Sequence, residues 1–249
     1  MLVAMRDEED AAAERDGNGG NGNMRLTAEH VALSLRPEPD LGHDPRWRPL
    51  EDPEVDALAA RLDAECGAGP LWVFAYGSLI WKPDFEAVDH RRATAHGWHR
   101  SFCLKMTRWR GSPQQTGLML ALARGGSCEG VIYRLPDEER RDQIRRVVKR
   151  EIRFHHALSM VRWIPVRTAA GRERALVFWA GPSGERVTGK LPLEEVAWTL
   201  ARACGSVGSC AEYLYNTVSH LEDYGIRDRN LWRLQELVAE EIERLHGAP

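Results

Sequence analysis

The stretch Trp72-Val-Phe-Ala-Tyr-Gly-Ser-Leu-Ile-Trp81 predicts a buried strand that ends directly in a glycine turn. Residues 71–76 are almost wholly apolar, which is typical of a strand buried on both faces. Gly77 frees the backbone to turn after the strand. Ser78 and Leu79 can then present backbone N–H groups outward, as loops that bind anions or oxyanions do. An ordinary strand exit with glycine as its turn residue is the alternative for this tripeptide.

Composition and charge indicate an ordinary globular protein. The chain has 249 residues, of which 43% are hydrophobic and 29% charged, and its formal net charge is −3. This charge recruits neither nucleic acid nor an anionic membrane, so we expect neither as a partner. The five cysteines are an odd number, contain no CxxC pair and fit no zinc spacing. We therefore expect reduced thiols in a cytosolic protein, since neither a signal peptide nor a membrane span is evident.

The order of predicted elements favours an α+β fold, a small mixed β-barrel with surrounding helices and a helical C-terminal part. Residues 1–24 are acidic and then rich in Gly and Asn, so we expect them to be disordered. Residues 25–66 are predicted to form an N-terminal arm and one short helix, and residues 67–247 the functional domain. Strands are predicted at 71–76, 98–106, 117–123, 128–135, 161–167 and 173–180. Helices are predicted near 53–65, at 137–152, from 193 to 204, from 209 to 224, and from 228 onward.

Glu151 interrupts the apolar face of the helix predicted at 137–152. Four residues at positions i, i+3, i+4 and i+8 form this face: Ile144, Val147, Val148 and Ile152. Glu151 occupies the missing i+7 position, where burial disfavours the carboxylate and raises its pKa. A carboxyl group tuned in this way can accept and return protons near neutral pH. The alternative is a glutamate at a fraying helix end that reaches solvent or pairs with Arg150 or Arg153.

The segment from Gly205 to Tyr213 leads through small residues into a helix N-terminus, where Ser209 and Glu212 have the spacing of a capping box. A helix N-terminus favours carboxylates through its free N–H groups and its dipole. Tyr213 lies one turn in, within reach of the same site. A helix-joining loop with a core tyrosine is the alternative.

Other sequence signals of chemistry are weak. The tandem His155-His156 has no Cys or acidic partner at ligand spacing, so we expect no metal. The basic-aromatic run at 108–110 is too short to indicate a nucleic-acid surface. The chain contains no Walker loop, no GxGxxG after a strand and no GxSxG.

Several segments together resemble the ChaC-like γ-glutamylcyclotransferase family. They are Trp72 to Trp81, Gly97-Trp-His-Arg-Ser-Phe-Cys-Leu104, Gly130-Val-Ile-Tyr-Arg-Leu-Pro136, Lys149-Arg-Glu151 and Gly205 to Leu214. The similarity runs from about residue 70 to residue 245. YGSLIW followed by Lys/Arg-Glu on the next helix is a specific combination, which favours catalysis at Glu151. The segment 152–160 departs from the family pattern and is a little longer, so the strict preference for glutathione stays open.

The resemblance implies a compact α+β barrel and a lyase that cleaves glutathione to 5-oxoproline and Cys-Gly without a cofactor or metal. By the family pattern, Glu151 is the general acid/base. The residues implied to bind the substrate are Tyr76, Gly77, Ser78, Leu79 and Tyr213. Three alternatives are a cyclotransferase for other γ-glutamyl amines, a non-catalytic ligand-binding protein on the same fold, and a nucleic-acid adaptor that uses the charges at 108–110 and 140–153.

Overall fold

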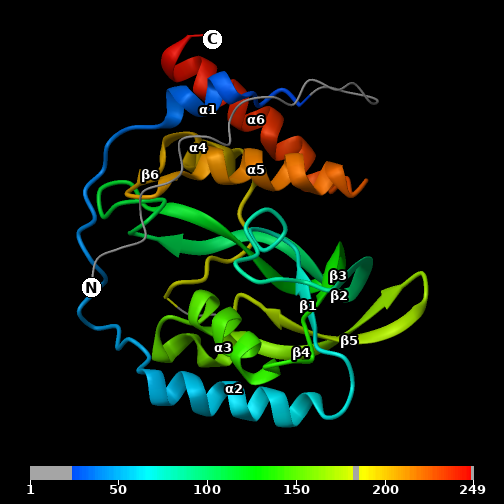
Figure 1. Cartoon of the computed structure of the whole chain (residues 1–249). Helices are drawn as coiled ribbons and strands as arrows, with labels where there is room; N and C mark the ends of the chain where they lie inside the picture. Colours follow the sequence, from blue (N-terminus) through cyan, green and yellow to red (C-terminus); the bar gives the residue numbers. More distant parts are fainter. Residues whose placement is uncertain (1–23, 182–184, 248–249) are drawn as a thin grey trace.

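Five strands form a closed barrel at the centre of the molecule (Figure 1). The structure, a computed structural model, describes residues 24–181 and 185–247. Around the barrel the strands follow the order β1, β3, β2, β4, β5. Their bounds are β1 Trp72–Ala75, β2 Asp89–Met106, β3 Gly117–Arg134, β4 Val161–Thr168 and β5 Gly171–Phe178. The pair β1–β5 is parallel and the others are antiparallel, so the barrel is mixed, as the sequence predicts.

The strand β1 is buried on both faces. Trp72 and Phe74 pack in an apolar cluster whose buried members all come from barrel strands, which is the barrel interior. Val73 and Ala75 point the other way, into the core that the strands share with the helices. Each of these four residues is at most 2% exposed. The unbroken apolar run in the sequence is therefore the signature of a two-sided strand.

The strands β2 and β3 are longer than the sequence predicts. Each has 18 residues, so the strands expected at 117–123 and 128–135 are one continuous strand. The expected break fell at Gly125 and Gly126, which have φ angles of +104° and +72°. They lie opposite a register shift between His96 and Trp98. Glycine accepts these angles without a steric penalty, so the ladder continues through an irregular bulge.

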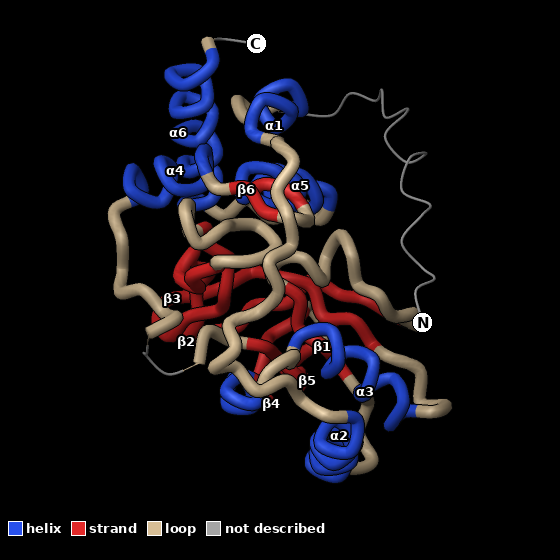
Figure 2. The backbone as a smooth tube through the Cα atoms, turned by 90° about the vertical axis from the view of Figure 1, so that its left-hand side faces the viewer, coloured by secondary structure: helices blue, strands red, loops and turns tan. Residues whose placement is uncertain are grey.

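Helices cover the barrel from two sides (Figures 1 and 2). The lower layer consists of α2 Asp52–Cys66 and α3 Arg140–Glu151, which pack on each other. The upper layer consists of α1 Ala28–Ser34, α4 Leu193–Arg202, α5 Cys210–Asp223 and α6 Arg229–His246. Short elements complete the chain: a 3₁₀ turn at His155–Met160 and the ribbon of β6 Cys204–Gly205 with β7 Gly208–Ser209. The α+β class and the helical C-terminal part are confirmed.

The N-terminal segment links the two helical layers. The sequence does not predict α1, whose capping Thr27 accepts a hydrogen bond from the His30 N–H and which buries Val31 and Ser34. Residues 35–51 then run along one side of the barrel to α2 (Figure 1). We call residues 35–51 the arm. The disorder expected for residues 1–24 concerns a stretch that, apart from Met24, lies outside the described residues.

Across residues 24–181 and 185–247, no helix combines the length and the apolar character needed to cross a lipid bilayer.

Candidate active site

The chain turns sharply where it leaves β1. The Ile80 N–H donates to the Gly77 carbonyl at 2.8 Å, which closes the turn. The Tyr76 hydroxyl donates to the carbonyl of Phe178 at the end of β5, at 2.7 Å. Leu79 turns its side chain into the core and is 5% exposed. The predicted substrate loop is therefore anchored on both sides, by its own turn and by a neighbouring strand.

Arg100 on β2 holds the start of this loop and is not among the predicted site residues. Its side chain is 1% exposed, and its Nε donates to the Tyr76 carbonyl at 2.7 Å. Nη2 donates to the Glu129 carbonyl, and Nη1 lies 3.1 Å from Asp228 Oδ2. A signal was present in the sequence, because Arg100 stands between Trp98 and Phe102 on the same buried strand face. A buried guanidinium of this kind needs every donor satisfied.

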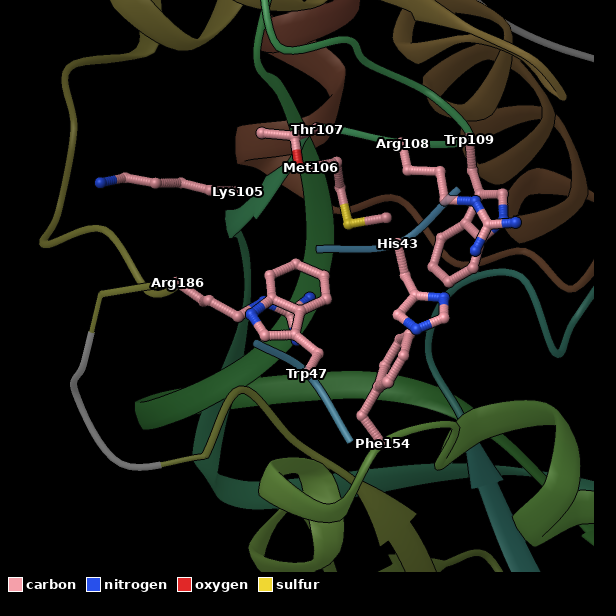
Figure 3. Close-up of a pocket in the computed structure, with 9 residues that line it drawn as sticks. All are labelled: His43, Trp47, Lys105, Met106, Thr107, Arg108, Trp109, Phe154 and Arg186. Carbon is pink, nitrogen blue, oxygen red and sulfur yellow. The ribbon is translucent and has the colours of Figure 1, made fainter. Parts of the chain in front are cut away.

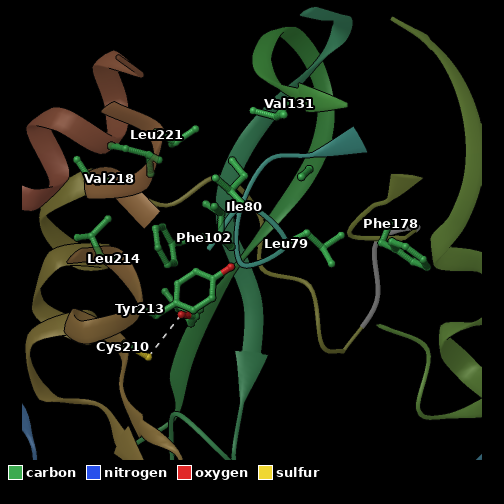
Figure 4. Packing of buried hydrophobic residues seen from close by; sticks show 14 of the residues in the cluster. Leu79, Ile80, Phe102, Val131, Phe178, Cys210, Tyr213, Leu214, Val218 and Leu221 are labelled. Carbon is green, nitrogen blue, oxygen red and sulfur yellow. Dashed lines mark hydrogen bonds between the residues drawn. The ribbon is translucent and has the colours of Figure 1, made fainter. Parts of the chain in front are cut away.

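Tyr213 on α5 reaches the same loop (Figure 4). Its hydroxyl accepts the Ser78 N–H at 3.3 Å. Gly77 makes this approach possible, because a Cβ there would lie 2.8 Å from the Tyr213 hydroxyl oxygen. The Tyr213 ring is 4% exposed and packs edge-on against Trp81, with ring centroids 5.8 Å apart. The glycine of the YGSL motif is thus required by a neighbouring side chain, whereas its φ lies outside the left-handed region that favours glycine.

Glu151 is the last residue of α3. The apolar face predicted for this helix is buried, and Ile144, Val147 and Val148 are at most 2% exposed. The side chain of Glu151 keeps 22% of its surface exposed, and Arg150 Nε lies 3.0 Å from its Oε1. Burial raises the pKa of Glu151, while the charges of Arg150 and Arg153 act in the opposite direction. Both sequence readings therefore hold in part: the carboxyl is largely buried and is also paired.

The three site elements act on one another electrostatically. Burial raises the pKa of Tyr76 well above its usual value, and the Glu151 charge adds to this effect. Burial also raises the pKa of Tyr213, again with a contribution from Glu151. Both phenols are therefore neutral at physiological pH and remain hydrogen-bond donors. The end of β1, the end of α3 and the start of α5 bring one ionisable carboxyl and two neutral phenols into one region.

The loop before α5 is packed against the residues that follow β2. A Cβ at Gly205 would lie 2.4 Å from the Trp109 carbonyl oxygen, so only glycine fits there. Ser209 caps α5 by accepting the Glu212 N–H at 3.0 Å. The Glu212 side chain bonds Arg110 at 2.5 Å, so the expected reciprocal half of the capping box is replaced by an ion pair. Glu212 therefore neutralises the charge of Arg110, which would otherwise attract an anion to the N-terminus of α5.

The remaining candidates do not form a site in the described parts of the chain. His155 and His156 belong to no group of three or more metal-ligating side chains there. Glu129, a carboxyl on β3, is 55% exposed and pairs with Arg92 at 3.2 Å.

A small hollow borders the segment that follows Glu151 (Figure 3). It is lined by His43 and Trp47 of the arm, by Lys105 to Trp109, and by Phe154 and Arg186. Pro49 and Phe154 form a β-bridge, and the Trp47 ring packs edge-on against Phe154 at 5.4 Å between centroids. Phe154, within the segment 152–160, is therefore covered by the arm.

Comparison with known proteins identifies the family of this chain. The ChaC-like protein family model matches residues 71–241. The chain belongs to the ChaC-like family. A glutathione-specific gamma-glutamylcyclotransferase of Escherichia coli is 36% identical over 70% of this chain and 75% of its own length. Gamma-glutamylcyclotransferase 2-3 of Arabidopsis thaliana is 29% identical over 68% of this chain and 88% of its own length.

A solved structure supports the ChaC-like fold. The selenomethionine-labelled gamma-glutamyl cyclotransferase specific to glutathione from yeast superposes with a TM-score of 0.63. It covers 71% of this chain and 99% of its own, with 21% sequence identity. At this identity the likeness concerns the fold. The part of this chain before residue 71, with α1, the arm and α2, lies outside the family match.

Proposed function

We propose that this ChaC-like protein is a glutathione-specific γ-glutamylcyclotransferase, which cleaves glutathione to 5-oxoproline and Cys-Gly. The observation that carries the proposal is the convergence of Glu151 with the Tyr76–Leu79 loop and Tyr213 at one end of the barrel. The names of relatives from E. coli and mouse support glutathione as the substrate.

The reaction needs little covalent chemistry from the protein. The α-amine of the substrate attacks the side-chain carbonyl of the same glutamyl residue, a five-membered ring closes, and the amine of Cys-Gly leaves. Holding the glutamyl chain curled contributes most, because well-oriented intramolecular attack gains up to roughly 7–11 kcal/mol. A rigid loop anchored by Arg100 and by the Tyr76 hydroxyl suits this task.

Glu151 is proposed as the general acid/base. As carboxylate it takes a proton from the attacking ammonium group, and as carboxylic acid it returns a proton to the departing amine of Cys-Gly. Both steps are served by a pKa raised toward neutral pH, and burial raises the pKa of Glu151 in that direction. The neighbouring phenols add no competing charge.

The loop is proposed to bind the γ-glutamyl group and the charge that develops on its carbonyl oxygen. Backbone N–H groups at Gly77 to Leu79 are the donors, as in other oxyanion sites. The Tyr213 hydroxyl, which now accepts the Ser78 N–H at 3.3 Å, is positioned to donate its own proton to a bound carboxylate or carbonyl.

One experiment tests the proposal. Purified protein is incubated with glutathione, and 5-oxoproline and Cys-Gly are measured by mass spectrometry. We expect both products in equal amounts, with the same rate after EDTA treatment. Absence of 5-oxoproline would contradict the function, and activity that EDTA abolishes and zinc or magnesium restores would contradict the metal-free mechanism.

A second candidate is a cyclotransferase that accepts other γ-glutamyl amines. The departure of residues 152–160 from the family pattern favours it, because this segment lies beside Glu151, where the leaving group sits. Supplying γ-glutamyl amino acids alongside glutathione in the same assay distinguishes the two. We further propose a reducing, cytosolic setting, which the five unpaired thiols of the structure support.

A further inference from the structure

Two arginines place positive charge close to the Glu151 carboxylate, and they differ in their partners. Arg150 is committed: its Nη1 lies 3.0 Å from Asp84 Oδ2 and its Nε 3.0 Å from Glu151 Oε1. Arg153 is exposed and forms no ion pair within 4.0 Å with any residue that the structure describes. Its charge nevertheless acts on Glu151, where it opposes the rise in pKa that burial causes. Arg153 is therefore a cation beside the proposed catalytic group that has no carboxylate of its own.

Arg153 is held in place at both ends. Its guanidinium carbon lies 5.0 Å from the centre of the Trp109 ring. Its carbonyl accepts the Leu50 N–H at 3.0 Å, and the His155 N–H donates to the Arg48 carbonyl at 2.9 Å. The aromatic face thus restricts the side chain, and the bonds to the arm fix the backbone from which it extends, before any ligand arrives. A cation ordered in advance loses less entropy when it binds an anion.

The proposed reaction brings an anion to this place. The amine that leaves must sit at Glu151 to receive its proton, and the dipeptide carries its carboxylate about 7 Å farther along an extended chain. Arg153 follows Glu151 by two residues and faces solvent at this position. We infer that Arg153 binds the C-terminal carboxylate of the leaving dipeptide and is a specificity-determining residue for glutathione. The inference rests on the proposed function, because it takes Glu151 as the group that meets the leaving amine.

The test compares glutathione with its C-terminal amide, which has the same scissile bond and lacks the carboxylate. The ratio kcat/KM is measured for both substrates in the wild type and in Arg153→Ala and Arg153→Gln. Arg174→Ala is the matched control, because Arg174 is also exposed and its guanidinium carbon lies 4.8 Å from the centre of the Trp163 ring. Arg174 lies beside the strand position paired with Trp72, at the start of β1, whereas the site is at the end of β1.

We expect the wild type to prefer glutathione over the amide. Both Arg153 variants should lose about 10- to 100-fold in kcat/KM on glutathione, mainly through KM, because a charge-assisted hydrogen bond is lost. Their kcat/KM on the amide should fall far less than on glutathione, because the amide has no carboxylate and loss of the Arg153 charge then acts only through the pKa of Glu151. Arg174→Ala should match the wild type on both substrates.

Four results overturn the inference. If the wild type turns over acid and amide equally, Arg153 does not bind the carboxylate. An equal loss on both substrates in the Arg153 variants would rule out the contact in the same way. Neither result contradicts the proposed function. Unchanged kinetics in the variants would also rule out the contact without contradicting the proposed function. If the wild type releases no 5-oxoproline from either substrate, both the proposed function and the inference that rests on it are wrong.

Discussion

The barrel end that carries the site and the arm that runs past it are held by different interactions. At the barrel end, Tyr213 is almost fully buried, and the Tyr76 hydroxyl donates a hydrogen bond to the Phe178 carbonyl. These side chains are therefore fixed by packing and by a bond to the backbone. The arm is mostly exposed and makes contact through charges and rings. Asp40 pairs with Arg108 at 2.6 Å, and the Arg186 guanidinium carbon lies 4.2 Å from the centre of the Trp47 ring.

The proposed catalytic residues lie at the barrel end, whereas the arm only covers part of the barrel surface. The family match begins at residue 71, so every proposed catalytic and substrate-binding residue lies inside it and the arm lies outside it. Packed cores open only with global unfolding, whereas exposed segments with few apolar contacts open locally at low cost. Changes in the barrel end should therefore abolish turnover, and changes in the arm should alter stability or specificity by smaller factors.

Replacing Glu151 by Gln should have the largest effect. The variant keeps the shape of the side chain and cannot transfer protons, so kcat should fall about 10²–10⁴-fold while substrate binding survives. The matched control is Glu129→Gln, an exposed carboxyl that should keep wild-type turnover. Steady-state kinetics on glutathione checks both, and a variant that keeps more than about a tenth of wild-type turnover would rule out the acid/base role.

The same Glu151 variant should change how stability depends on pH. A carboxyl whose folded pKa lies above its ordinary value of 4.5 is protonated more readily in the folded state. Its contribution to stability is complete below that ordinary value and is lost as pH rises through the raised pKa. Urea unfolding at a series of pH values should show the wild type losing stability relative to Glu151→Gln as pH rises. A constant difference would mean that Glu151 is not buried enough to shift.

Gly77→Ala should follow in size. The new Cβ would lie 2.8 Å from the Tyr213 hydroxyl oxygen, so the phenol or the loop must move. A displacement of this order at the reacting groups should lower kcat/KM about 10- to 100-fold. Gly189→Ala is the control, because its Cβ would meet no atom within 4 Å. Equal activity of the two variants would show that the contact between Gly77 and Tyr213 does not matter.

Trp47→Ala should weaken the arm by a moderate amount. It removes the ring contacts with Phe154 and His156 and the cation–π contact with Arg186, which together contribute about 1–3 kcal/mol. Urea denaturation measures the loss, with the exposed Trp198→Ala as the control for removing an indole. If the two variants lose the same stability, the contacts of the Trp47 indole do not hold the arm on the barrel.

Removing residues 1–23 should have the smallest effect. The segment that remains has anchors of its own: Arg25 pairs with Glu240 at 2.6 Å, and the Leu26 N–H donates to Gln235 Oε1 at 2.8 Å. A chain that starts at Met24 should keep the melting temperature and the kcat of the full chain. A chain that starts at Asp52 also lacks α1 and the arm, and its melting temperature should drop. A large loss in the shorter truncation would show that residues 1–23 complete the core or the site.

Much of the fold could be predicted because local patterns matched the final contacts. The apolar run before Gly77 was a two-sided strand, and the apolar residues predicted to line one face of α3 are buried, as their spacing indicated. Prediction was wrong where tertiary pairing overrode local signals. Gly125 and Gly126 predicted a chain break, yet the paired β2 carries β3 through them.

The site could be predicted in part. The YGSL motif was recognisable in the sequence as the exit of a strand. The steric reason for Gly77 could not be predicted, because Tyr213, which a Cβ there would contact, lies far away in sequence. The position of Arg100 between Trp98 and Phe102 indicated burial, but its role was missed because its three bonds go to residues on other elements. The helix α1 was also missed, because it is short and its burial depends on packing against α5 and α6.

The pH dependence of kcat/KM on glutathione tests most directly whether Glu151 is the proton-transfer group. Because burial raises its pKa above 4.5, kcat/KM should rise with pH through an apparent pKa above that value as the base ionises. The residual activity of Glu151→Gln should not show this rise, which is the acidic limb of the pH profile. A limb at or below 4.5 in the wild type, or the same limb in the variant, would contradict the account.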